Sequence, residues 1–443
     1  NILFGLYRAD SGEIFWKDQL ANFTSPKEAI AAGVGMVQQH FSLVNKMTVL
    51  DNVILNLKGN AFVLNRAAAR ARLVELAEKY GLQVNPDALI CELSVGEQQR
   101  VEILKALYRN VELLILDEPT GVLTPQETTQ FFDVLRNLKN EGYGIIIITH
   151  RMSEIMAISD RVTILRDGKQ VADLVTAETN PGELSAYMIG RELNESYNIE
   201  GTPKAENMLV MKHVSNDHKH HGRHKIEAID LVIRKGEILG IAGVEGNGQK
   251  ELAEVITGIQ KKKSGQIILD GQDMAGKTIR ERYEAGISYI SEDRLSDSLI
   301  TGMNIIDNLL LRDYKKLPFA KHSIVNRSAM RKNAKEKMQQ YQVRASGKSG
   351  VDTQVRLLSG GNQQKLIIAR ELTDSAKLII ASQPTRGLDI GATEFVRQQL
   401  IDQRNAGKAV MLISADLEEI MALSDRIAVL FGGKIVGVLS REE

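Results

Sequence analysis

The stretch Leu93-Ser94-Val95-Gly96-Glu97-Gln98-Gln99 recurs later in the chain as Leu358-Ser359-Gly360-Gly361-Asn362-Gln363-Gln364, an offset of 265 residues from position 93 to position 358. The same offset carries further matches, which are Pro119-Thr120 onto Pro384-Thr385, Ser159-Asp160-Arg161-Val162 onto Ser424-Asp425-Arg426-Ile427, and Gly168-Lys169 onto Gly433-Lys434. Nearer the start of each copy the offset is 253, which carries Gly5 onto Gly258 and Gly33 onto Gly286. Offsets held over so many matches indicate a tandem duplication. The chain is therefore predicted to contain two homologous domains.

The boundary between the copies is predicted from the pattern of apolar residues. Residues 190–207 are polar and have no sustained apolar period, so we place a linker at 194–207, between a first domain at 1–193 and a second at 208–443. Apolar runs of strand type alternate with helical patterns in each copy; the runs are Leu113–Leu116, Ile145–Ile148 and Val162–Leu165, then Leu378–Ile380, Val410–Ile413 and Ile427–Leu430. Strands that alternate with helices predict α/β domains built on mostly parallel sheets.

The composition excludes several classes of protein. Among the 443 residues, Lys+Arg and Asp+Glu are both 56, so no basic surplus exists to neutralise a phosphate backbone, and no nucleic-acid partner is expected. Cys91 is the only cysteine, which excludes intrachain disulfides and is typical of a reducing compartment such as the cytoplasm. The apolar runs are far shorter than the ~20 residues of a membrane-spanning helix. Any membrane association is therefore expected to come through partner chains.

A glycine-rich turn in the second copy has the shape of a phosphate-binding loop. The strand-like stretch 235–242 is followed by Gly243-Val244-Glu245-Gly246-Asn247-Gly248-Gln249-Lys250 and then by a predicted helix. Backbone N–H groups in such a turn, together with the helix dipole, hold phosphate oxygens. A working P-loop, G-x-x-x-x-G-K-[ST], has Lys where Gln249 stands and a hydroxyl where Lys250 stands. We expect weak nucleotide binding here; a tight turn without a ligand is the alternative.

The first copy carries polar side chains that the second copy lacks. The run Leu113–Leu116 is followed by Asp117 and Glu118, at the carboxyl end of a strand, where α/β sheets place their ligands. Asp117 suits Mg²⁺ coordination, and Glu118 suits activation of an attacking water. His150 follows the next strand, and Gln39 follows an earlier one. The two offsets place the counterparts of these four residues at Ser382, Gln383, Ala415 and Glu292.

The offsets also predict that both ends of this sequence are cut. With the 253 offset, the first-copy counterpart of Gly243–Lys250 falls upstream of Asn1, so the first P-loop is expected to be missing from these residues. With the 265 offset, Glu443 matches Glu178, whereas the first copy runs on to about Leu193. Without the Lys and Ser/Thr of a first P-loop, we expect little or no ATP hydrolysis from these residues alone.

Taken together, these motifs resemble those of ATP-binding cassette (ABC) proteins over essentially the whole chain. Leu93–Gln99 and Leu358–Gln364 are similar to the signature motif, Gln39 to the Q-loop, Asp117-Glu118 to the Walker B acid with its catalytic glutamate, and His150 to the switch histidine. The resemblance implies two P-loop NTPase domains, each with a helical subdomain that carries the signature. It also implies that they pair head to tail, so that each ATP lies between one domain's P-loop and the other domain's signature.

The resemblance assigns roles to individual residues. It implies that Glu118, His150 and Gln39 are catalytic, and that Asp117 and Gln39 are ligands of Mg²⁺. It implies ATP contacts from Ser359, Gly360, Gly361 and Gln363 in a competent site, and from Ser94, Gly96, Gly243, Gly246, Asn247, Gly248, Gln249 and Lys250 in a degenerate site. One hydrolytic site for each fused pair of domains is therefore expected.

A narrower resemblance is to the fused double cassettes of bacterial nucleoside and simple-sugar importers. It is carried by the degenerate second P-loop, by Gln39-His40-Phe41, by Glu292-Asp293-Arg294 and by Gln383–Asp389. It implies an ATPase at the cytoplasmic face of the plasma (inner) membrane, bound to two membrane permeases that an extracytoplasmic binding protein supplies with substrate. The alternatives are a soluble double-cassette ATPase outside transport, for which two intact sites are expected together with long charged helical inserts or a basic surface, and a hydrolytically dead cassette module.

Overall fold

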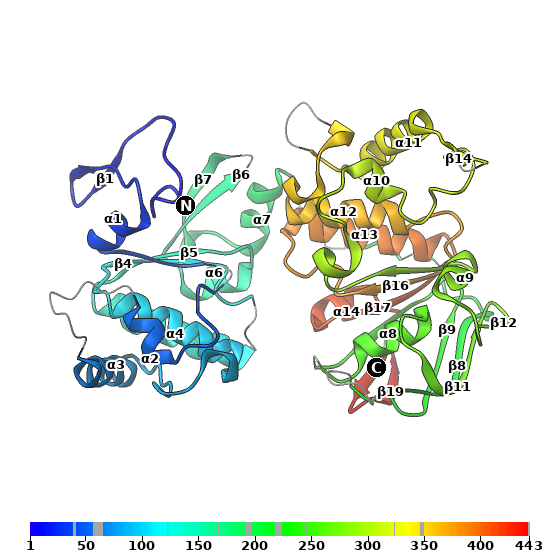
Figure 1. Ribbon diagram of the computed structural model, residues 1–443, viewed down its shortest axis with the longest axis horizontal. Helices are drawn as coiled ribbons and strands as arrows, with labels where there is room; N and C mark the ends of the chain where they lie inside the picture. Colours follow the sequence, from blue (N-terminus) through cyan, green and yellow to red (C-terminus); the bar gives the residue numbers. More distant parts are fainter. Residues whose placement is uncertain are drawn as a thin grey trace. The chain divides into compact units, whose positions relative to one another are not determined.

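The computed structural model describes residues 1–38, 41–55, 65–121, 123, 125–166, 168–191, 197–199, 201–217, 224–244, 246–322, 324–345 and 350–441. It divides into two compact units, Asn1–Arg191 and Glu192–Glu443. Each unit combines strands with helices that cover them, as Figure 1 shows. The predicted α/β class is confirmed.

The first unit follows the predicted alternation of strands and helices. Its elements are β1 (Ile14–Trp16), β2 (Gln19–Ala21), α1 (Pro26–Ala31), β3 (Val34–Val37), α2 (Val49–Ile54), α3 (Arg66–Tyr80), α4 (Val95–Leu107), β4 (Leu113–Asp117), α5 (Pro125–Asn140), β5 (Gly144–Ile148), α6 (Met152–Ile158), β6 (Arg161–Arg166), β7 (Lys169–Val175) and α7 (Pro181–Ile189), with 3-10 turns at Ile90–Glu92 and Thr176–Glu178. Strands β3, β4 and β5 form a parallel sheet in that order, whereas β6 and β7 form a separate antiparallel pair.

Strand β4 is the buried centre of the first unit. Because side chains alternate between the two faces of a strand, Leu114 and Leu116 pack among residues of α2 to α5, whereas Ile115 packs on the other face with Phe4 and Phe23. Apolar packing on both faces fixes this strand firmly. It therefore holds the residues at its carboxyl end, which begin with Asp117, in a defined place.

The second unit repeats this plan with more strands. Its elements are β8 (Asn207–Asn216), β9 (Ile229–Arg234), β10 (Ile238–Ala242), α8 (Gln249–Thr257), β11 (Lys262–Leu269), β12 (Gln272–Asp273), α9 (Ile279–Glu284), β13 (Ile287–Ile290), a π-helical turn (Arg294–Ser298), α10 (Ile305–Leu309), β14 (Ala320–Lys321), β15 (Ile324–Val325), α11 (Arg327–Gln340), 3-10 turns (Gly350–Asp352 and Val355–Leu357), α12 (Gly360–Glu371), β16 (Leu378–Ser382), α13 (Ile390–Asn405), β17 (Ala409–Ile413), α14 (Leu417–Leu423), β18 (Arg426–Phe431) and β19 (Lys434–Ser440).

A six-stranded sheet is the core of the second unit. Its order is β13-β16-β17-β10-β18-β19, and all neighbours are parallel except β18 and β19. One face packs on α12 and α13 through residues such as Val410 and Leu412, and the other packs on α8 and on the antiparallel sheet β12-β11-β8-β9 through Met411 and Ile413. Figure 1 shows α12 and α13 on one side of β16 and β17, and α8 on the other.

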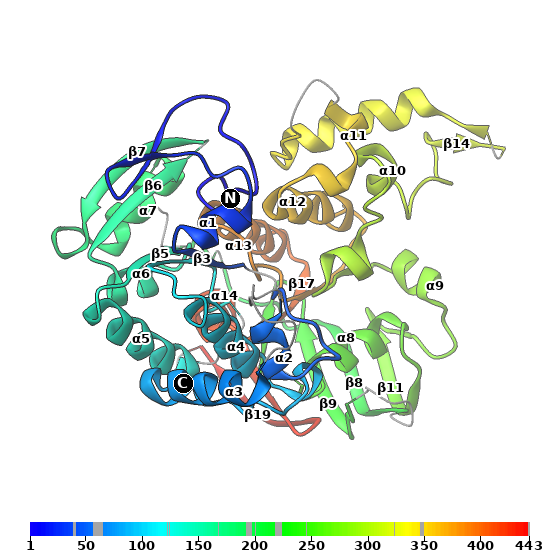
Figure 2. The ribbon, with the colours of Figure 1, turned by 60° about the vertical axis from the view of Figure 1, so that its left-hand side comes forward.

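The helical subdomains that carry the signature are also present. In the second unit, α10 and α11 pack with α12 in one apolar cluster, and Figure 2 shows them extending away from the central sheet. In the first unit, α2 and α3 pack with α4 in the same manner. The predicted division of each cassette into a sheet part and a helical part is confirmed.

The two sheets differ at β5. Its residues Ile146 and Ile148 are 41% and 46% exposed, whereas their counterparts Met411 and Ile413 are 0% and 2% exposed. In the second unit, β10 lies between β17 and β18 and joins them into one sheet. Among the described residues of the first unit, no strand takes that place between β5 and β6. One edge and one face of β5 are therefore uncovered within this part of the chain.

The predicted linker is partly built into the second unit. Strand β8 begins at Asn207, one residue inside the predicted linker, and Tyr197 packs against the core of the unit. The guanidinium of Arg404, which is 2% exposed, donates to the Gly201 carbonyl at 3.0 Å and to the Asp425 carboxylate at 2.7 Å. Sequence periodicity missed this docking because single side chains and main-chain groups make it, rather than an apolar face.

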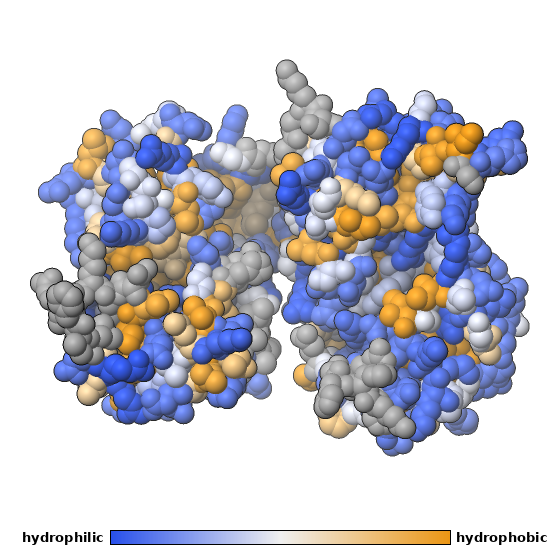
Figure 3. Space-filling view, in the orientation of Figure 1, coloured by the Kyte–Doolittle hydropathy of each residue, from blue (hydrophilic) through white to orange (hydrophobic). Residues whose placement is uncertain are grey.

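On the face drawn in Figure 3, hydrophilic residues dominate both units, with smaller apolar patches among them. None of the helices in the described part of the chain combines the length and the apolar character that a membrane crossing requires.

Candidate hydrolytic site

The predicted acids and histidine of the first copy lie together at the carboxyl ends of β4 and β5. Asp117 is the last residue of β4, and Glu118 follows it directly. His150 comes two residues after the end of β5, which pairs with β4 in parallel. The Nδ1 atom of His150 lies 3.2 Å from Oε1 of Glu118, and both side chains are half-buried. The structure therefore brings these three residues together, as the sequence predicts.

The electrostatics of the two acids differ. The hydrogen bond from His150 lowers the pKa of Glu118 below its ordinary value, and burial only partly opposes this effect. The positive charge of Arg151 also lowers the pKa of Glu118. Burial raises the pKa of Asp117, and the neighbouring charge of Glu118 raises it further. Glu118 is therefore ionised at neutral pH, while the Asp117 carboxylate is held in a place that disfavours its charge.

The donor chemistry of Asp117 fits a divalent cation. No described residue donates a side-chain or main-chain hydrogen bond to its carboxylate, and burial and the charge of Glu118 together raise its pKa. Hard cations such as Mg²⁺ take oxygen ligands, and a bound cation favours the ionised carboxylate. The second predicted ligand, Gln39, lies outside the described residues.

The turn after β4 has the same main chain in both copies. Glu118 has φ of 46° and its counterpart Gln383 has φ of 47°, in the left-handed region. The N–H of Glu118 donates to the Ile148 carbonyl at 2.8 Å, and the N–H of Gln383 donates to the Ile413 carbonyl at 2.7 Å. This shared bond across the two strand ends is the local reason for the shared turn.

The side chains on this turn differ between the copies. In the second copy, the side-chain amide oxygen Oε1 of Gln383 accepts the N–H of Ala415 at 3.2 Å. A backbone group thus takes the place that the His150 side chain has in the first copy. Glu292, the counterpart of Gln39, is ion-paired with Arg386, and Arg294 donates to the Arg386 carbonyl at 3.0 Å. None of these described contacts reproduces the carboxylate–histidine pair of the first copy.

The glycine-rich loop of the second copy keeps its shape but is filled by its own side chains. Gly246 and Gly248 have φ of 88° and 104°, and a Cβ atom on Gly243 would lie 2.5 Å from the Leu430 carbonyl oxygen. The Gln249 amide folds back, accepting the N–H of Asn247 at 3.0 Å and donating to the Val244 carbonyl at 2.9 Å. The loop therefore requires glycines, and the Gln249 amide is hydrogen-bonded to two of its main-chain groups.

Lys250 points away from this loop. Its Nζ atom lies 3.9 Å from carboxylate oxygens of both Glu254 and Asp297, and the side chain is exposed. This orientation differs from the nucleotide contact expected of Lys250, because one step along a helix turns a side chain by about 100° from the direction of residue 249. The position of Lys250 gives no replacement for the lysine of a working P-loop.

The two signature serines begin their helices with different partners. Ser94 caps α4 in a capping box, in which its N–H and its hydroxyl both donate to Glu97 Oε2 at 2.8 Å. Ser359 caps α12, and its hydroxyl oxygen accepts from the Asn362 amide at 2.9 Å. The Ser94 hydroxyl therefore donates its proton to Glu97, whereas the Ser359 hydroxyl acts as the acceptor in its bond with Asn362 and does not donate to it.

Close packing explains the glycines at positions 96 and 361 of the signature motifs. A Cβ atom on Gly96 would lie 2.4 Å from the Glu127 carboxylate on α5, and one on Gly361 would lie 3.1 Å from Ala392. Gly360 has more room, since its Cβ atom would lie 3.8 Å from Arg294. Gln363 differs from the prediction that it contacts nucleotide: its side chain is buried and donates to the Val355 carbonyl at 3.3 Å. Gln363 lies in the first turn of α12, and its hydrogen bond fastens the preceding 3-10 turn to this helix.

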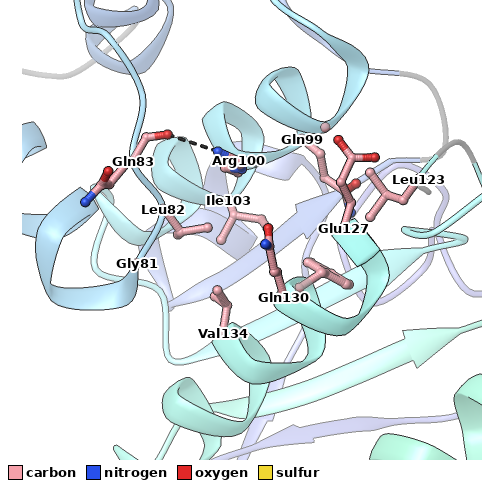
Figure 4. Close-up of a pocket in the computed structure, with 12 residues that line it drawn as sticks. Gly81, Leu82, Gln83, Gln99, Arg100, Ile103, Leu123, Glu127, Gln130 and Val134 are labelled. Atoms are coloured by element: carbon pink, nitrogen blue, oxygen red, sulfur yellow. Dashed lines mark hydrogen bonds between the residues drawn. The ribbon is translucent and has the colours of Figure 1, made fainter. Parts of the chain in front are cut away.

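A pocket of about 290 Å³ lies beside the first signature helix rather than at the acids. It is bounded by α4, α5 and the turn after α3, and Figure 4 shows Gln99, Ile103 and Gln130 around it. Arg100 donates to the Gln83 carbonyl at its rim. Neither atom of the buried Gln99 amide has a hydrogen-bond partner among the residues that the structure describes. The predicted catalytic residues do not line this pocket.

Sequence reasoning missed a group of residues that lies behind the Glu118–His150 pair. These residues are Thr120, Thr149, Arg151 and Glu154. All of them lie within four positions of a residue that the motifs single out, so proximity in sequence is the signal that could have found them. Their contacts involve two different strand ends, and those contacts emerge only from the fold.

The chain is similar to known proteins in both sequence and fold. A family model described as "ABC transporter" matches residues 1–121 and 226–386. The chain is 42% identical to the nucleoside import ATP-binding protein NupA of Lactococcus lactis subsp. cremoris (strain MG1363), over 100% of this chain and 87% of that protein. It is 44% identical to the guanosine import ATP-binding protein NupO of Bacillus subtilis (strain 168), over 100% of this chain and 86% of that protein. Among solved structures, the archaeal ribosome recycling factor aABCE1, in complex with the stalk protein aP1, matches with a TM-score of 0.59 at 20% identity, over 92% of this chain and 74% of that chain.

Proposed function

The chain belongs to the ABC transporter family, and on that premise we propose that it is the ATP-hydrolysing subunit of an import system for a nucleoside or a simple sugar. Two relatives named for nucleoside and guanosine import, at 42% and 44% identity over the whole chain, support this assignment and favour a nucleoside as cargo. The likeness to the ribosome recycling factor concerns the fold alone.

The subunit has one hydrolytic and one degenerate nucleotide site in this proposal. The observation that carries it is the Glu118–His150 pair, 3.2 Å apart in the first copy, where the second copy has Gln383 bonded to the main chain of Ala415. An ionised carboxylate at a strand end can orient a water molecule and accept its proton, whereas a neutral amide cannot accept one. The proposal therefore assigns hydrolysis to the first copy.

The roles of the residues follow from their contacts. Glu118 accepts the proton of the attacking water, and the hydrogen bond from His150 keeps the carboxylate ionised and in place. Asp117, with no described hydrogen-bond donor, would hold the Mg²⁺ that accompanies ATP. That ion would neutralise charge on the phosphates as the bond to the leaving oxygen breaks.

The two signature motifs support the same asymmetry. A helix N-terminus with a free serine hydroxyl is favourable for a phosphate group. At Ser359 the neighbouring Asn362 is neutral and leaves the serine proton free for an acceptor. At Ser94 the hydroxyl donates to the charged Glu97 carboxylate, which would also repel phosphate. In the head-to-tail pairing that the family implies, the first signature serves the degenerate site and the second serves the hydrolytic site.

The partners and the boundaries complete the proposal. Two membrane permeases bind the subunit at the cytoplasmic face of the plasma (inner) membrane, and an extracytoplasmic binding protein delivers the substrate to them. Residues 1–193 and 208–443 are the two cassettes, and residues 194–207 join them.

Reconstitution of the full-length gene product with its permeases and binding protein in liposomes tests this function. We expect ATP-dependent uptake of labelled guanosine or of labelled ribose. Replacing Glu118 by Gln should lower ATP turnover by roughly 10²-fold to 10⁴-fold, as loss of a general base does. The matched change Glu141→Gln, at an exposed residue after α5, should have no such effect. Full turnover in the Glu118→Gln variant would refute the hydrolytic role of the first copy. Turnover without binding to permease membranes would favour a soluble double cassette, and a wild type without turnover would favour the dead module.

A further inference from the structure

We propose that Glu154 is a positioning residue for hydrolysis, because it ties the turn that carries Glu118 to the turn that carries His150. The inference rests on the proposed function of that pair. Glu154 is not part of any motif singled out in the sequence, and it contacts the neighbours of the pair rather than the pair itself.

The contacts of Glu154 reach both turns at once. The residue lies in the first turn of α6 and is 4% exposed. Its Oε2 atom accepts the hydroxyl of Thr149 at 2.9 Å, and its Oε1 atom accepts the hydroxyl of Thr120. Thr149 directly precedes His150, and Thr120 comes two residues after Glu118. One buried carboxylate therefore joins the two short segments that present the catalytic pair.

Arg151 closes this network. Its guanidinium Nη1 atom donates to the Thr120 carbonyl and to Glu154 Oε1, at 3.3 Å each. The main-chain N–H of Arg151 donates to the Thr149 hydroxyl oxygen at 3.1 Å. The buried charge of Glu154 thus has two hydroxyl donors and one cation, which is the condition for keeping an ionised group inside a protein.

The second copy provides an internal comparison. Its counterpart of Glu154 is Glu419, which is fully buried but is held by Arg397 from α13, with Nε 3.1 Å from Oε1. Its Oε2 atom has no hydrogen-bond partner in the described part of the chain. Ser414, the counterpart of Thr149, accepts the N–H of Asp416 at 3.1 Å, and no hydrogen bond links it to Glu419 in the described residues.

The comparison shows whether the carboxylate link is needed to form the turn or to align the Glu118–His150 pair. The second unit forms the same strands and the same turn without linking them through a carboxylate. The link is present in the copy that has the Glu118–His150 pair and absent from the copy that lacks it. Glu154 therefore serves the alignment of that pair rather than the formation of the turn.

The expected effect is on the chemical step. Misplacement of a catalytic group by about 1 Å can cost on the order of 10²-fold in rate. In the full-length gene product, Glu154→Ala should lower kcat for ATP by roughly 10-fold to 100-fold, with KM changed by less than about 3-fold. Glu154→Gln keeps one acceptor and gains a donor for the second hydroxyl, so it should restore most of kcat. Thr149→Val removes one link without a change of charge and should share the loss.

Two controls distinguish positioning from general stabilisation. Glu419→Gln and Glu419→Ala make the matched changes at the equivalent buried carboxylate and should leave kcat within about 2-fold. In a His150→Ala background, Glu154→Ala should cause little further loss, because a residue that acts through the pair has no effect once the pair is broken. Losses that multiply in the double variant would overturn the proposal, as would an unchanged kcat in both Glu154→Ala and Thr149→Val.

A spectroscopic measurement tests the alignment without hydrolysis. In protein labelled with ¹⁵N at histidine, the ring-nitrogen signals of His150, assigned with His150→Ala, report its hydrogen bond to Glu118. We expect Glu154→Ala to change these signals in the same direction as Glu118→Gln, and Glu154→Gln and Glu419→Gln to leave them unchanged. Unchanged signals in Glu154→Ala would overturn the proposal. If Glu118→Gln keeps full turnover, the proposed function of the pair fails, and these signals still decide whether Glu154 aligns it.

Discussion

In the head-to-tail pairing on which the proposed function rests, replacing Glu97 by Asn should tighten nucleotide binding at the site that contains the glycine-rich loop of the second copy. Glu97 accepts both the N–H and the hydroxyl of Ser94, and these bonds hold its pKa below the ordinary value of 4.5. It is therefore ionised at neutral pH and draws the serine proton to itself. Asn362 occupies the same place in the second signature, where it is neutral and donates to the oxygen of Ser359. The substitution converts the first signature to the form of the second.

The magnitude follows from the geometry of the capping box. The Glu97 carboxylate oxygen lies 2.8 Å from the Ser94 hydroxyl. A phosphate oxygen that accepted the same hydroxyl from outside, at about 2.8 Å, would lie roughly 5 Å from that carboxylate. Two like unit charges at about 5 Å repel by about 1 kcal/mol in water and by about 3 kcal/mol at an effective dielectric constant of 20. Relief of this repulsion corresponds to a gain in affinity of roughly 5-fold to 150-fold.

Titration calorimetry of these 443 residues with MgATP measures the effect, because both the loop and the first signature lie within them. The reverse change, Asn362→Glu, is the matched control and should not tighten binding at this site. The gain should shrink as salt is raised, since salt screens exposed charges. Loss of the capping box should cost about 0.5–1 kcal/mol in the free energy of unfolding. An unchanged Kd in a variant that is folded normally would refute the reasoning that the first signature acts on this nucleotide.

Three further predictions concern other parts of the chain. His150→Ala should raise the pKa of Glu118 toward its ordinary value. Because the wild-type pKa is lowered, the associated stability is present above about pH 4.5 and is lost as pH falls through the lowered value, so the difference in urea unfolding between the two proteins should be full at pH 6 and should shrink as the pH is lowered below about 4.5. Arg404→Ala leaves the partly buried Asp425 carboxylate without its cation, although the N–H of Ile238 still donates to it, and should cost the second unit about 1–3 kcal/mol in denaturant unfolding, with the transition of the first unit unmoved. The double change Gln249→Lys and Lys250→Ser restores a P-loop pattern and should tighten MgATP binding in calorimetry without restoring hydrolysis at that site, because the acids of the second copy remain absent.

Much of the fold was predictable because the strands are buried. In β16 and β17 every residue is buried, so their apolar runs stand out from the surrounding sequence. The duplication then placed the same elements in both copies. The short hairpin of β1 and β2 is not predicted, because each strand has only three residues and a run that short shows no period, although most of its residues are apolar. The docking of Tyr197 was missed for a different reason, since a single aromatic residue has no period.

The site was predictable where strand ends determine it. Asp117, Glu118 and His150 follow adjacent parallel strands, and the ends of such strands meet at one edge of a sheet. The ion pair between Glu292 and Arg386 joins residues 94 positions apart, and no spacing in the sequence indicates it. The prediction for Gln363 did not consider the direction in which its helix turns it. Contacts that depend on helix phase, or on side chains far apart in sequence, thus require the structure.

The left-handed turn that Glu118 and Gln383 share has an evolutionary consequence. A residue other than glycine in this conformation carries a cost of order 1–3 kcal/mol, and the second copy retains it without a carboxylate to present. After duplication, therefore, mutation altered the side chains while the main chain stayed fixed. A codon for glutamine becomes a codon for glutamate by a change of one base, so the second copy stands a single nucleotide from placing an acid on a turn already shaped for it. In the proposed function, several such differences, at Gln249, Ser382, Gln383 and Ala415, together keep the second copy from hydrolysing ATP, so this one change would not restore hydrolysis.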